Sequence, residues 1–135
     1  MLSIQLHKGY KQNKYLQEMI NLEKKLFETT LKPIYKIDQE IYYIYILNYD
    51  QVIGFATYKD RDLSFDLFKI GVDPIFQNQG IGSMIIKEMK EKKITIEVRD
   101  NNIKAIKFYE KHGFKKITIL KNYYGSNDGI KMIRE

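Results

Sequence analysis

The segment from Val72 to Ser83 constrains the fold most, because it joins an apolar run of strand type directly to a helix through a turn that contains two glycines. The apolar residues after the turn recur at helical spacing. The first N–H groups of such a helix are free and carry partial positive charge. Gly80 and Gly82 have no side chain that could keep a ligand off the backbone. The sequence therefore predicts an anion-binding turn.

Two common phosphate-binding motifs do not fit this turn. A P-loop needs Lys-Ser or Lys-Thr directly after its last glycine, whereas Gly82 is followed by Ser83 and Met84. The dinucleotide-binding fingerprint needs a glycine or an alanine where Ile85 stands. What remains is Gln-x-x-Gly-x-Gly, beginning at Gln77, and Gly-x-Gly also ends many ordinary strand-to-helix turns. The turn alone leaves both interpretations open.

A second block, residues 94–114, contains in order a strand ending in Glu-Val-Arg, then Asn, Ala-Ile, Phe-Tyr-Glu and Gly-Phe. Together with the glycine turn, this order resembles the GNAT superfamily of N-acetyltransferases. It is most similar to the RimI-type ribosomal-protein alanine N-acetyltransferases. The tail, with Lys-Asn-Tyr-Tyr at 121–124 and Asp-Gly at 128–129, resembles that type as well, so the match covers residues 63–135.

The pattern of the whole chain predicts one α/β domain over residues 1–135. Helices are expected at 13–28, 80–91 and 101–111, and strands at 41–47, 52–58, 63–72, 94–98, 114–120 and 129–134, with 31–39 left unassigned. The order agrees with what the resemblance implies. That is a GNAT (acyl-CoA N-acyltransferase) fold, with a mixed, mainly antiparallel central sheet, flanking helices and a V-shaped split between the two central strands.

Composition excludes several classes of protein. The 135 residues are 44% hydrophobic, which fits a single domain. Because there is no cysteine, a disulfide framework, a thiol nucleophile and a cysteine zinc site are all impossible, and only His7 and His112 offer imidazole, so no metal is expected. The longest apolar run, 41–47, is too short to span a membrane, and residues 1–10 lack the apolar stretch of a signal peptide. We therefore expect a cytoplasmic protein.

The formal charge of +6 does not by itself indicate a nucleic-acid partner, because the basic residues are mostly lysines spread along the chain. The abundance of Lys, Ile, Asn and Tyr is typical of A/T-rich codon usage. Excess positive charge would nevertheless help to attract coenzyme A. The sequence has no nucleic-acid recognition motif, so a basic RNA-associated protein is the weaker alternative.

Glu97 is the candidate general base. Strand periodicity places Ile94, Ile96 and Val98 on one face and Thr95 and Glu97 on the other. An α-amino group or a lysine is mainly protonated near neutral pH, so an acetyl acceptor needs a base to take its proton. The resemblance implies this role for Glu97, and the alternative is an ordinary solvated strand glutamate.

Tyr109 and Asn102 lie on the helix that follows. The resemblance implies that the Tyr109 phenol protonates the leaving thiolate of the coenzyme and that Asn102 contacts the coenzyme. Each has a structural alternative. Tyr109 beside Phe108 is also typical of core packing, and either Asn102 or Asn101 could cap the helix. His112 is expected only to end this helix, beside Gly113.

The resemblance also implies the binding residues for acetyl-CoA, the expected co-substrate. The backbone of the strand before the turn would pair with the acetyl carbonyl and the pantetheine amides, and the turn would hold the pyrophosphate. Tyr123 and Tyr124 are candidates for shaping the acceptor slot, although they also suit loop aromatics packed on a sheet. The expected coenzyme-binding residues are Ile70, Gly71, Val72, Gln77, Asn78, Gln79, Gly80, Ile81, Gly82, Ser83 and Asn102.

The sequence predicts an acetyl-CoA-dependent N-acetyltransferase acting on a primary amine, for which the resemblance suggests a protein N-terminal α-amino group. The Pro-Trp-Ser stretch typical of the RimI type is absent, and the chain has no tryptophan. A small-molecule amine or a lysine side chain therefore stays open as the acceptor. A non-catalytic acyl-CoA-binding module is a further alternative.

Overall fold

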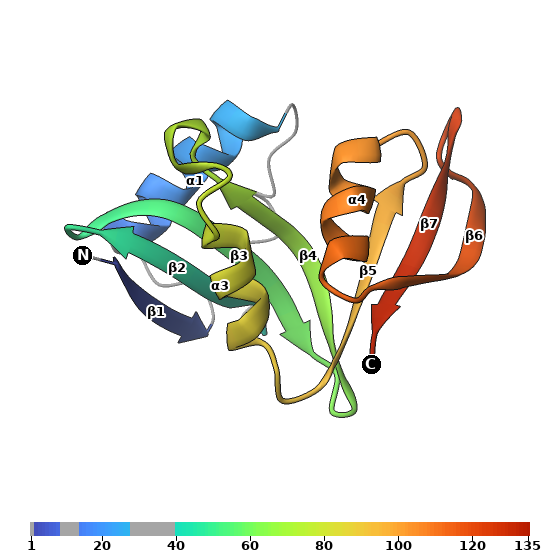
Figure 1. Ribbon diagram of the computed structural model, residues 1–135, viewed down its shortest axis with the longest axis horizontal. Helices are drawn as coiled ribbons and strands as arrows, with labels where there is room; N and C mark the ends of the chain where they lie inside the picture. Colours follow the sequence, from blue (N-terminus) through green and yellow to red (C-terminus); the bar gives the residue numbers. More distant parts are fainter. Residues whose placement is uncertain (1, 9–13, 28–39) are drawn as a thin grey trace.

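The computed structural model describes residues 2–8, 14–27 and 40–135 (Figure 1). These residues form a seven-stranded sheet in the order β1-β2-β3-β4-β5-β7-β6, in which only β4 and β5 are parallel neighbours. The strands are β1 (Leu2–Lys8), β2 (Tyr42–Asn48), β3 (Gln51–Asp60), β4 (Ser64–Val72), β5 (Lys93–Arg99), β6 (Lys115–Tyr124) and β7 (Asn127–Arg134). The helices are α1 (Lys14–Leu26), the 3-10 helix η1 (Pro74–Phe76), α3 (Ile81–Glu88) and α4 (Ile103–Lys111).

The predicted mixed sheet with flanking helices is confirmed, but the predicted element order is wrong at its start. The chain begins with strand β1, an edge strand paired with β2, where the sequence analysis placed no element. Its Leu2, Ile4 and Leu6 alternate as in a strand, but an edge strand is largely exposed and its pattern is weak. Residues 13, 28 and 31–39 of the predicted elements lie outside the described residues.

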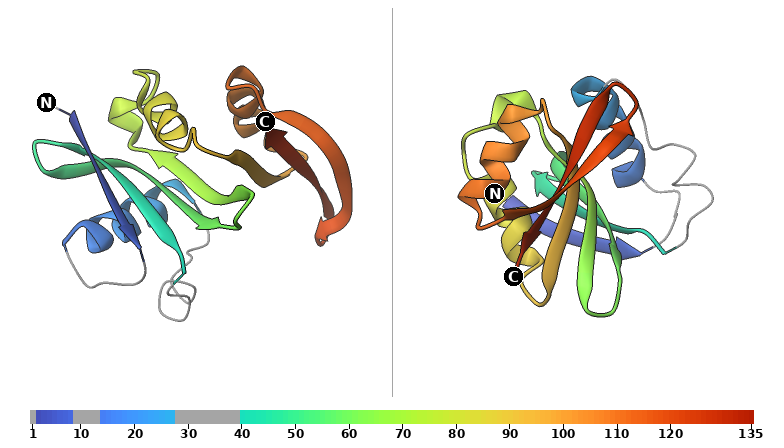
Figure 2. Two further views of the ribbon diagram at one scale, coloured as in Figure 1. Left: turned by 90° about the horizontal axis from the view of Figure 1, so that it is seen from below. Right: turned by 90° about the vertical axis from the view of Figure 1, so that its right-hand side faces the viewer.

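Helices cover both faces of the sheet (Figure 2). On one face α1 packs through Leu16, Met19 and Leu22 against a core of β2 and β3 side chains. On the other face α3 and α4 bury their apolar stripes against β2 to β5 and β7. The strand side chains alternate between these two cores, as expected for a sheet buried on both sides. Among the described residues no helix is both long and apolar enough to cross a membrane.

Strands β4 and β5 pair only at their beginnings and then diverge (Figure 1). The pairing starts at Ser64 with Lys93 and ends at Leu67 with Ile96. The next residue of β4, Phe68, has no partner on β3, because the register shifts there. Such a bulge bends a strand and increases its twist. The bulge therefore lies where β4 leaves β5, and the predicted V-shaped split between the central strands is confirmed.

Helix α3 is shorter than the predicted 80–91, and a side chain from far along the sequence contacts its carboxyl end. The guanidinium of Arg134 on β7 donates to the carbonyl oxygens of Met89 at 3.1 Å and Lys92 at 3.0 Å. A cation at the end of a helix satisfies free carbonyl groups and interacts favourably with the helix dipole. Arg134 thus satisfies carbonyl groups between the end of α3 at Glu88 and the start of β5.

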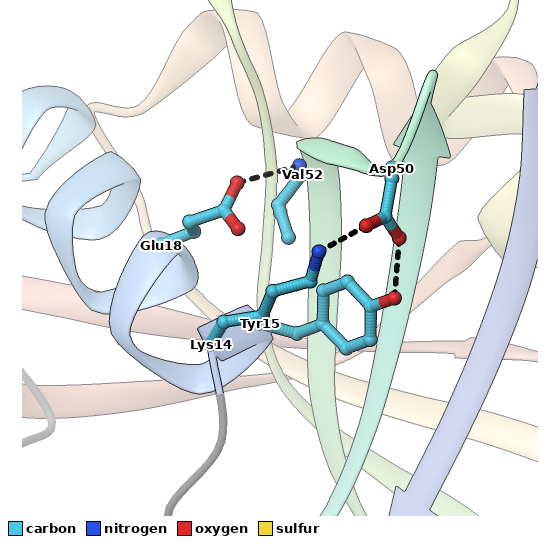
Figure 3. Close-up of polar contacts among 5 residues, drawn as sticks. All are labelled: Lys14, Tyr15, Glu18, Asp50 and Val52. Atoms are coloured by element: carbon cyan, nitrogen blue, oxygen red, sulfur yellow. Dashed lines mark hydrogen bonds and ion pairs between the residues drawn. The ribbon is translucent and has the colours of Figure 1, made fainter.

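The start of α1 is tied to the turn between β2 and β3 (Figure 3). Lys14 and Tyr15 both donate to the carboxylate of Asp50. One turn further on, Glu18 accepts a hydrogen bond of 3.1 Å from the Val52 amide. These contacts fix the orientation of α1 over the sheet.

The substitution Asp50→Asn is expected to destabilise the protein near neutral pH and to have less effect in acid. The hydrogen bonds from Lys14 and Tyr15 lower the pKa of Asp50 in the folded state. The carboxylate therefore contributes stability above its unfolded pKa of about 3.9, and this contribution is lost as the pH falls through the lower folded value. Thermal melts of the two proteins should converge toward acid pH. A constant difference in Tm at every pH would contradict this role for the charge.

Candidate active site

The turn before α3 presents free backbone donors. Gly80 is the N-cap of α3 with a φ of +82°, a left-handed conformation that favours glycine. It makes no side-chain capping bond, so the first N–H groups of the helix, from Ile81 to Ser83, stay free of a side-chain cap. A Cβ at Gly80 would meet no atom within 4 Å, so the space in front of the turn is open. This geometry fits the predicted anion-binding turn.

The two glutamines of the motif bond to the chain around the turn. The Gln77 amide donates to the Val72 carbonyl at 3.0 Å, and the Gln79 amide donates to the Ile75 carbonyl at 3.3 Å. Lys104 of α4 in turn donates to the Gln77 side-chain oxygen at 3.3 Å. The glutamines thus set the shape of the turn, and Lys104 brings a cation to it. Nothing in the local sequence indicates this role of Lys104, because only the fold brings α4 to this turn.

Gly82 needs to be glycine for a reason that the sequence did not reveal. The expectation was that its missing side chain leaves room for a phosphate. In the structure a Cβ at Gly82 would lie 2.8 and 2.9 Å from two ring carbons of Phe108 on α4. The space is therefore filled by the packing of α3 against α4. Gly71 is similar, since a Cβ there would lie 2.8 Å from Phe55 and 2.9 Å from Leu26.

Ser83 and His112 form a second link between α3 and α4. Nδ1 of His112 lies 2.8 Å from the Phe108 carbonyl oxygen and donates to it, because a carbonyl only accepts. In the neutral ring Nε2 is then the acceptor, and the Ser83 hydroxyl donates to it at 2.6 Å. The expectation that His112 only ends a helix was incomplete. A distant serine was its partner, and local sequence could not indicate this.

Strand β4 offers an unpaired backbone edge to the split. Ile70, Gly71 and Val72 pair with β3 on one side. On the other side, the last residue of β4 that pairs with β5 is Leu67, so these three residues lie beyond the β4–β5 pairing. Alternate N–H and C=O groups of this segment therefore point into the split, where an extended ligand with amide groups could pair with them.

Glu97 lies on β5 immediately after its last pair with β4, which is at Ile96. The predicted alternation is confirmed, because Ile94, Ile96 and Val98 are buried in the α3–α4 core while Glu97 is half-buried on the opposite face. The Tyr123 phenol lies beside the Glu97 carboxylate. Its interaction with this carboxylate raises the pKa of Tyr123 to about 12.

Tyr123 and Tyr124 come from the far end of β6 and meet the face of β5 that carries Glu97. Their rings contact edge to face with centroids 5.0 Å apart. The guanidinium of Arg99 lies 4.6 Å from the centre of the Tyr124 ring. Burial raises the pKa of Tyr124, and the charge of Glu97 acts in the same direction while Arg99 opposes it. The structure therefore brings Glu97, Arg99 and both tyrosines together.

Tyr109 lies on the other side of β5, in the core beneath α4. It is 5% exposed, and its ring packs against Phe108 and Phe114 at centroid distances of 5.5 and 5.2 Å. Burial raises the pKa of its phenol, so the group stays protonated at neutral pH. Asn102 is the N-cap of α4, where its side-chain oxygen accepts from the Ala105 amide at 3.2 Å.

The split thus has a distinct group on each side. The open turn at the start of α3, the free edge of β4 and the Glu97 carboxylate lie along the split, while Tyr109 lies in the core on the other face of β5. Over residues 2–8, 14–27 and 40–135, no three His, Asp or Glu side chains are grouped so that they could hold a metal ion.

Comparison with known proteins agrees with this geometry. Residues 38–116 match the family model for the acetyltransferase (GNAT) domain. The chain is 38% identical over 89 residues to the "[ribosomal protein bS18]-alanine N-acetyltransferase" of Haemophilus ducreyi, an alignment that covers 61% of each chain. This chain therefore spans about three-fifths of the length of that curated relative.

Two solved structures have the same fold. The ribosomal-protein-S18-alanine N-acetyltransferase from Escherichia coli superimposes with a TM-score of 0.77 at 25% identity, covering 98% of this chain and 93% of that one. A GNAT family acetyltransferase from Elizabethkingia anophelis, solved with acetyl-CoA bound, superimposes with a TM-score of 0.78 at 21% identity, covering 99% and 97%. The family match extends over more than half of the chain, from the start of β2 to the start of β6, and the chain belongs to the GNAT acetyltransferase family.

Proposed function

We propose that this protein is an acetyl-CoA-dependent N-acetyltransferase that moves an acetyl group directly to a primary amine, and that the amine is a protein N-terminal α-amino group. The observation that carries the proposal is the split between β4 and β5. It has free helix N–H groups at one end and Glu97 beside the point of divergence. A diphosphate at the turn would leave the thioester of an extended coenzyme to lie between the two strands.

In the proposed reaction the amine nitrogen attacks the thioester carbonyl, the carbon–sulfur bond breaks, and an amide and a thiolate form. Glu97 takes the proton that the amine must lose. Tyr109 gives its phenolic proton to the thiolate and regains one after product release. Backbone N–H groups on the free edge of β4 stabilise the developing oxyanion, and one such donor can contribute about 3 kcal/mol. In this scheme the base and the acid act from opposite faces of β5.

Two facts support a protein N-terminus as the acceptor. The curated relative from Haemophilus ducreyi and the solved Escherichia coli structure are both named as alanine N-acetyltransferases of a ribosomal protein. Tyr123 and Tyr124 also place aromatic and phenolic surface beside Glu97, which suits an extended peptide. The proposal places the protein in the cytoplasm, where ribosomal proteins are made.

Two measurements test this function. A thermal-shift series should show stabilisation by acetyl-CoA and by coenzyme A but not by ATP or NAD. Release of free thiol should then be followed with acetyl-CoA and a set of peptides, polyamines and aminoglycosides. Turnover with peptides bearing a free N-terminus supports the proposal. Turnover with small amines alone would rule out the peptide acceptor, and stabilisation without turnover would indicate a non-catalytic module.

Tyr109→Phe is expected to lower kcat by about 10²-fold, because it removes one hydroxyl that donates a proton to the leaving thiolate. The ring and its packing stay, so acetyl-CoA-induced stabilisation and Tm should change little. Steady-state thiol release and thermal melts of the two proteins check this. If kcat is unchanged, Tyr109 serves only the core and water protonates the thiolate.

A further inference from the structure

Lys131 is directly opposite Glu97 in the antiparallel pair of β5 and β7. Residues opposite each other in such a pair project to the same face, with Cβ atoms about 5 Å apart. Lys131 therefore lies on the acceptor side of the sheet, beside the proposed base. It is half-buried, between Ile130 and Met132, whose side chains are buried in the α3–α4 core.

Lys131 does not simply neutralise Glu97. In the described structure no ion pair of 4.0 Å or less joins these two side chains, and the Glu97 carboxylate interacts with the Tyr123 phenol instead. Arg99, two residues beyond Glu97 on the same face, has its guanidinium over the Tyr124 ring. Two cations therefore flank the base.

The nearby carboxylates on this side of the sheet already have partners. Asp66 lies 3.6 Å from the Arg61 guanidinium and accepts from Thr95 at 3.2 Å. The fully buried Glu23 lies 3.6 Å from Lys69. Within the part of the chain that the structure describes, neither Lys131 nor Arg99 forms an ion pair with any of these carboxylates, so both cations can meet a charge on the acceptor.

We propose, on the basis of the proposed function, that Lys131, assisted by Arg99, selects acceptors whose second residue is acidic. The α-amino group must reach Glu97, and the next Cα of an extended peptide lies about 3.8 Å further along. Because Lys131 is only about 5 Å across the sheet from Glu97, a carboxylate on the second residue comes within reach of its ammonium group. A basic second residue would instead be repelled.

The test uses three peptides that differ only at the second residue, Ala-Glu, Ala-Gln and Ala-Lys, each with an amidated carboxyl end. Their kcat/KM values with acetyl-CoA should fall in that order, with Ala-Glu about tenfold above Ala-Lys, because attraction and repulsion at a partly exposed site each contribute a few-fold. Added salt should compress this ratio.

Two variants assign the preference to Lys131. Lys131→Met should reduce the ratio of kcat/KM for Ala-Glu to kcat/KM for Ala-Lys, leaving only the part that Arg99 contributes. Lys131→Glu should reverse the order of the three peptides. Lys90→Glu is the matched control, because it changes the net charge equally but follows α3 on the opposite face, and it should keep the wild-type order. The Met variant has no new charge beside Glu97 and tests the proposal even if the Glu variant does not fold.

The outcomes separate this inference from the function on which it rests. Equal kcat/KM values for the three peptides, or an order unchanged by Lys131→Met, would overturn the selection by Lys131 and leave the peptide acetyltransferase intact. Acetylation of none of the three peptides, together with turnover of small amines, would overturn the proposed function and this inference with it.

Discussion

Glu97→Gln is expected to lower kcat by about 10²- to 10⁴-fold at neutral pH, with little change in affinity for acetyl-CoA. Glutamine keeps the size of the side chain and a polar oxygen beside Tyr123, but it cannot take a proton from the acceptor amine. Steady-state thiol release with a peptide acceptor measures kcat, and acetyl-CoA-induced stabilisation reports the affinity. Since Glu97 is half-buried on the strand surface, the fold should tolerate the change.

The pH dependence sharpens this test. An α-amino group has a pKa of about 7.7 to 8.0, so more of the acceptor becomes neutral without help as the pH rises through that range. The difference in kcat between Glu97→Gln and the wild type should therefore become smaller above about pH 8. Tyr123→Phe is the matched control, because it removes the phenolic hydroxyl beside the carboxylate but leaves the base in place. It should lower kcat less than Glu97→Gln does. Equal kcat values for Glu97→Gln and the wild type would exclude Glu97 as the base.

Gly82→Val is expected to abolish acetyl-CoA-induced stabilisation and to lower the free energy of unfolding by about 1 to 3 kcal/mol. A Cβ at this position already overlaps the Phe108 ring, and a branched side chain must push α3 away from α4. The free N–H groups of the α3 first turn would move with the helix. Thermal melts with and without acetyl-CoA measure both effects.

A double variant shows which contact is responsible. Gly82→Ala alone should be destabilising, and Gly82→Ala combined with Phe108→Leu should recover stability and acetyl-CoA binding, because the smaller side chain leaves room for the new methyl group. Such coupling is what a double-mutant cycle detects between residues in contact. If the double variant regains stability but not binding, the methyl group blocks the phosphate directly, as the sequence analysis expected.

Several features of the site could be predicted from local sequence patterns. The alternation of Ile94, Ile96 and Val98 with Glu97 predicted which face of β5 would carry the carboxylate, and the structure confirms it. The glycine turn predicted free N–H groups at the start of a helix, and α3 begins there with no side-chain cap. These features depend on a strand period of two and on backbone conformation, and both are properties of neighbouring residues.

Other features required contacts between distant residues. Gly82 packs against Phe108, the partner of Ser83 is His112, and the end of α3 is contacted by Arg134. Each pair is far apart in the sequence, and no local spacing relates its two members. Helix packing therefore gives Gly82 a role that its place in the turn did not indicate, and its contact with the coenzyme stays a prediction.

The sequence by itself determined the alternating strands, the glycine turn and the residue types that acid–base chemistry needs, because these follow from short-range periodicity and backbone preference. Only the tertiary structure decided that β4 leaves β5 after Leu67, that Tyr123 reaches Glu97 and that Lys131 stands opposite it. The physical reason is that strand register and the bulge at Phe68 arise from pairing between distant segments, which the pattern of one segment does not encode.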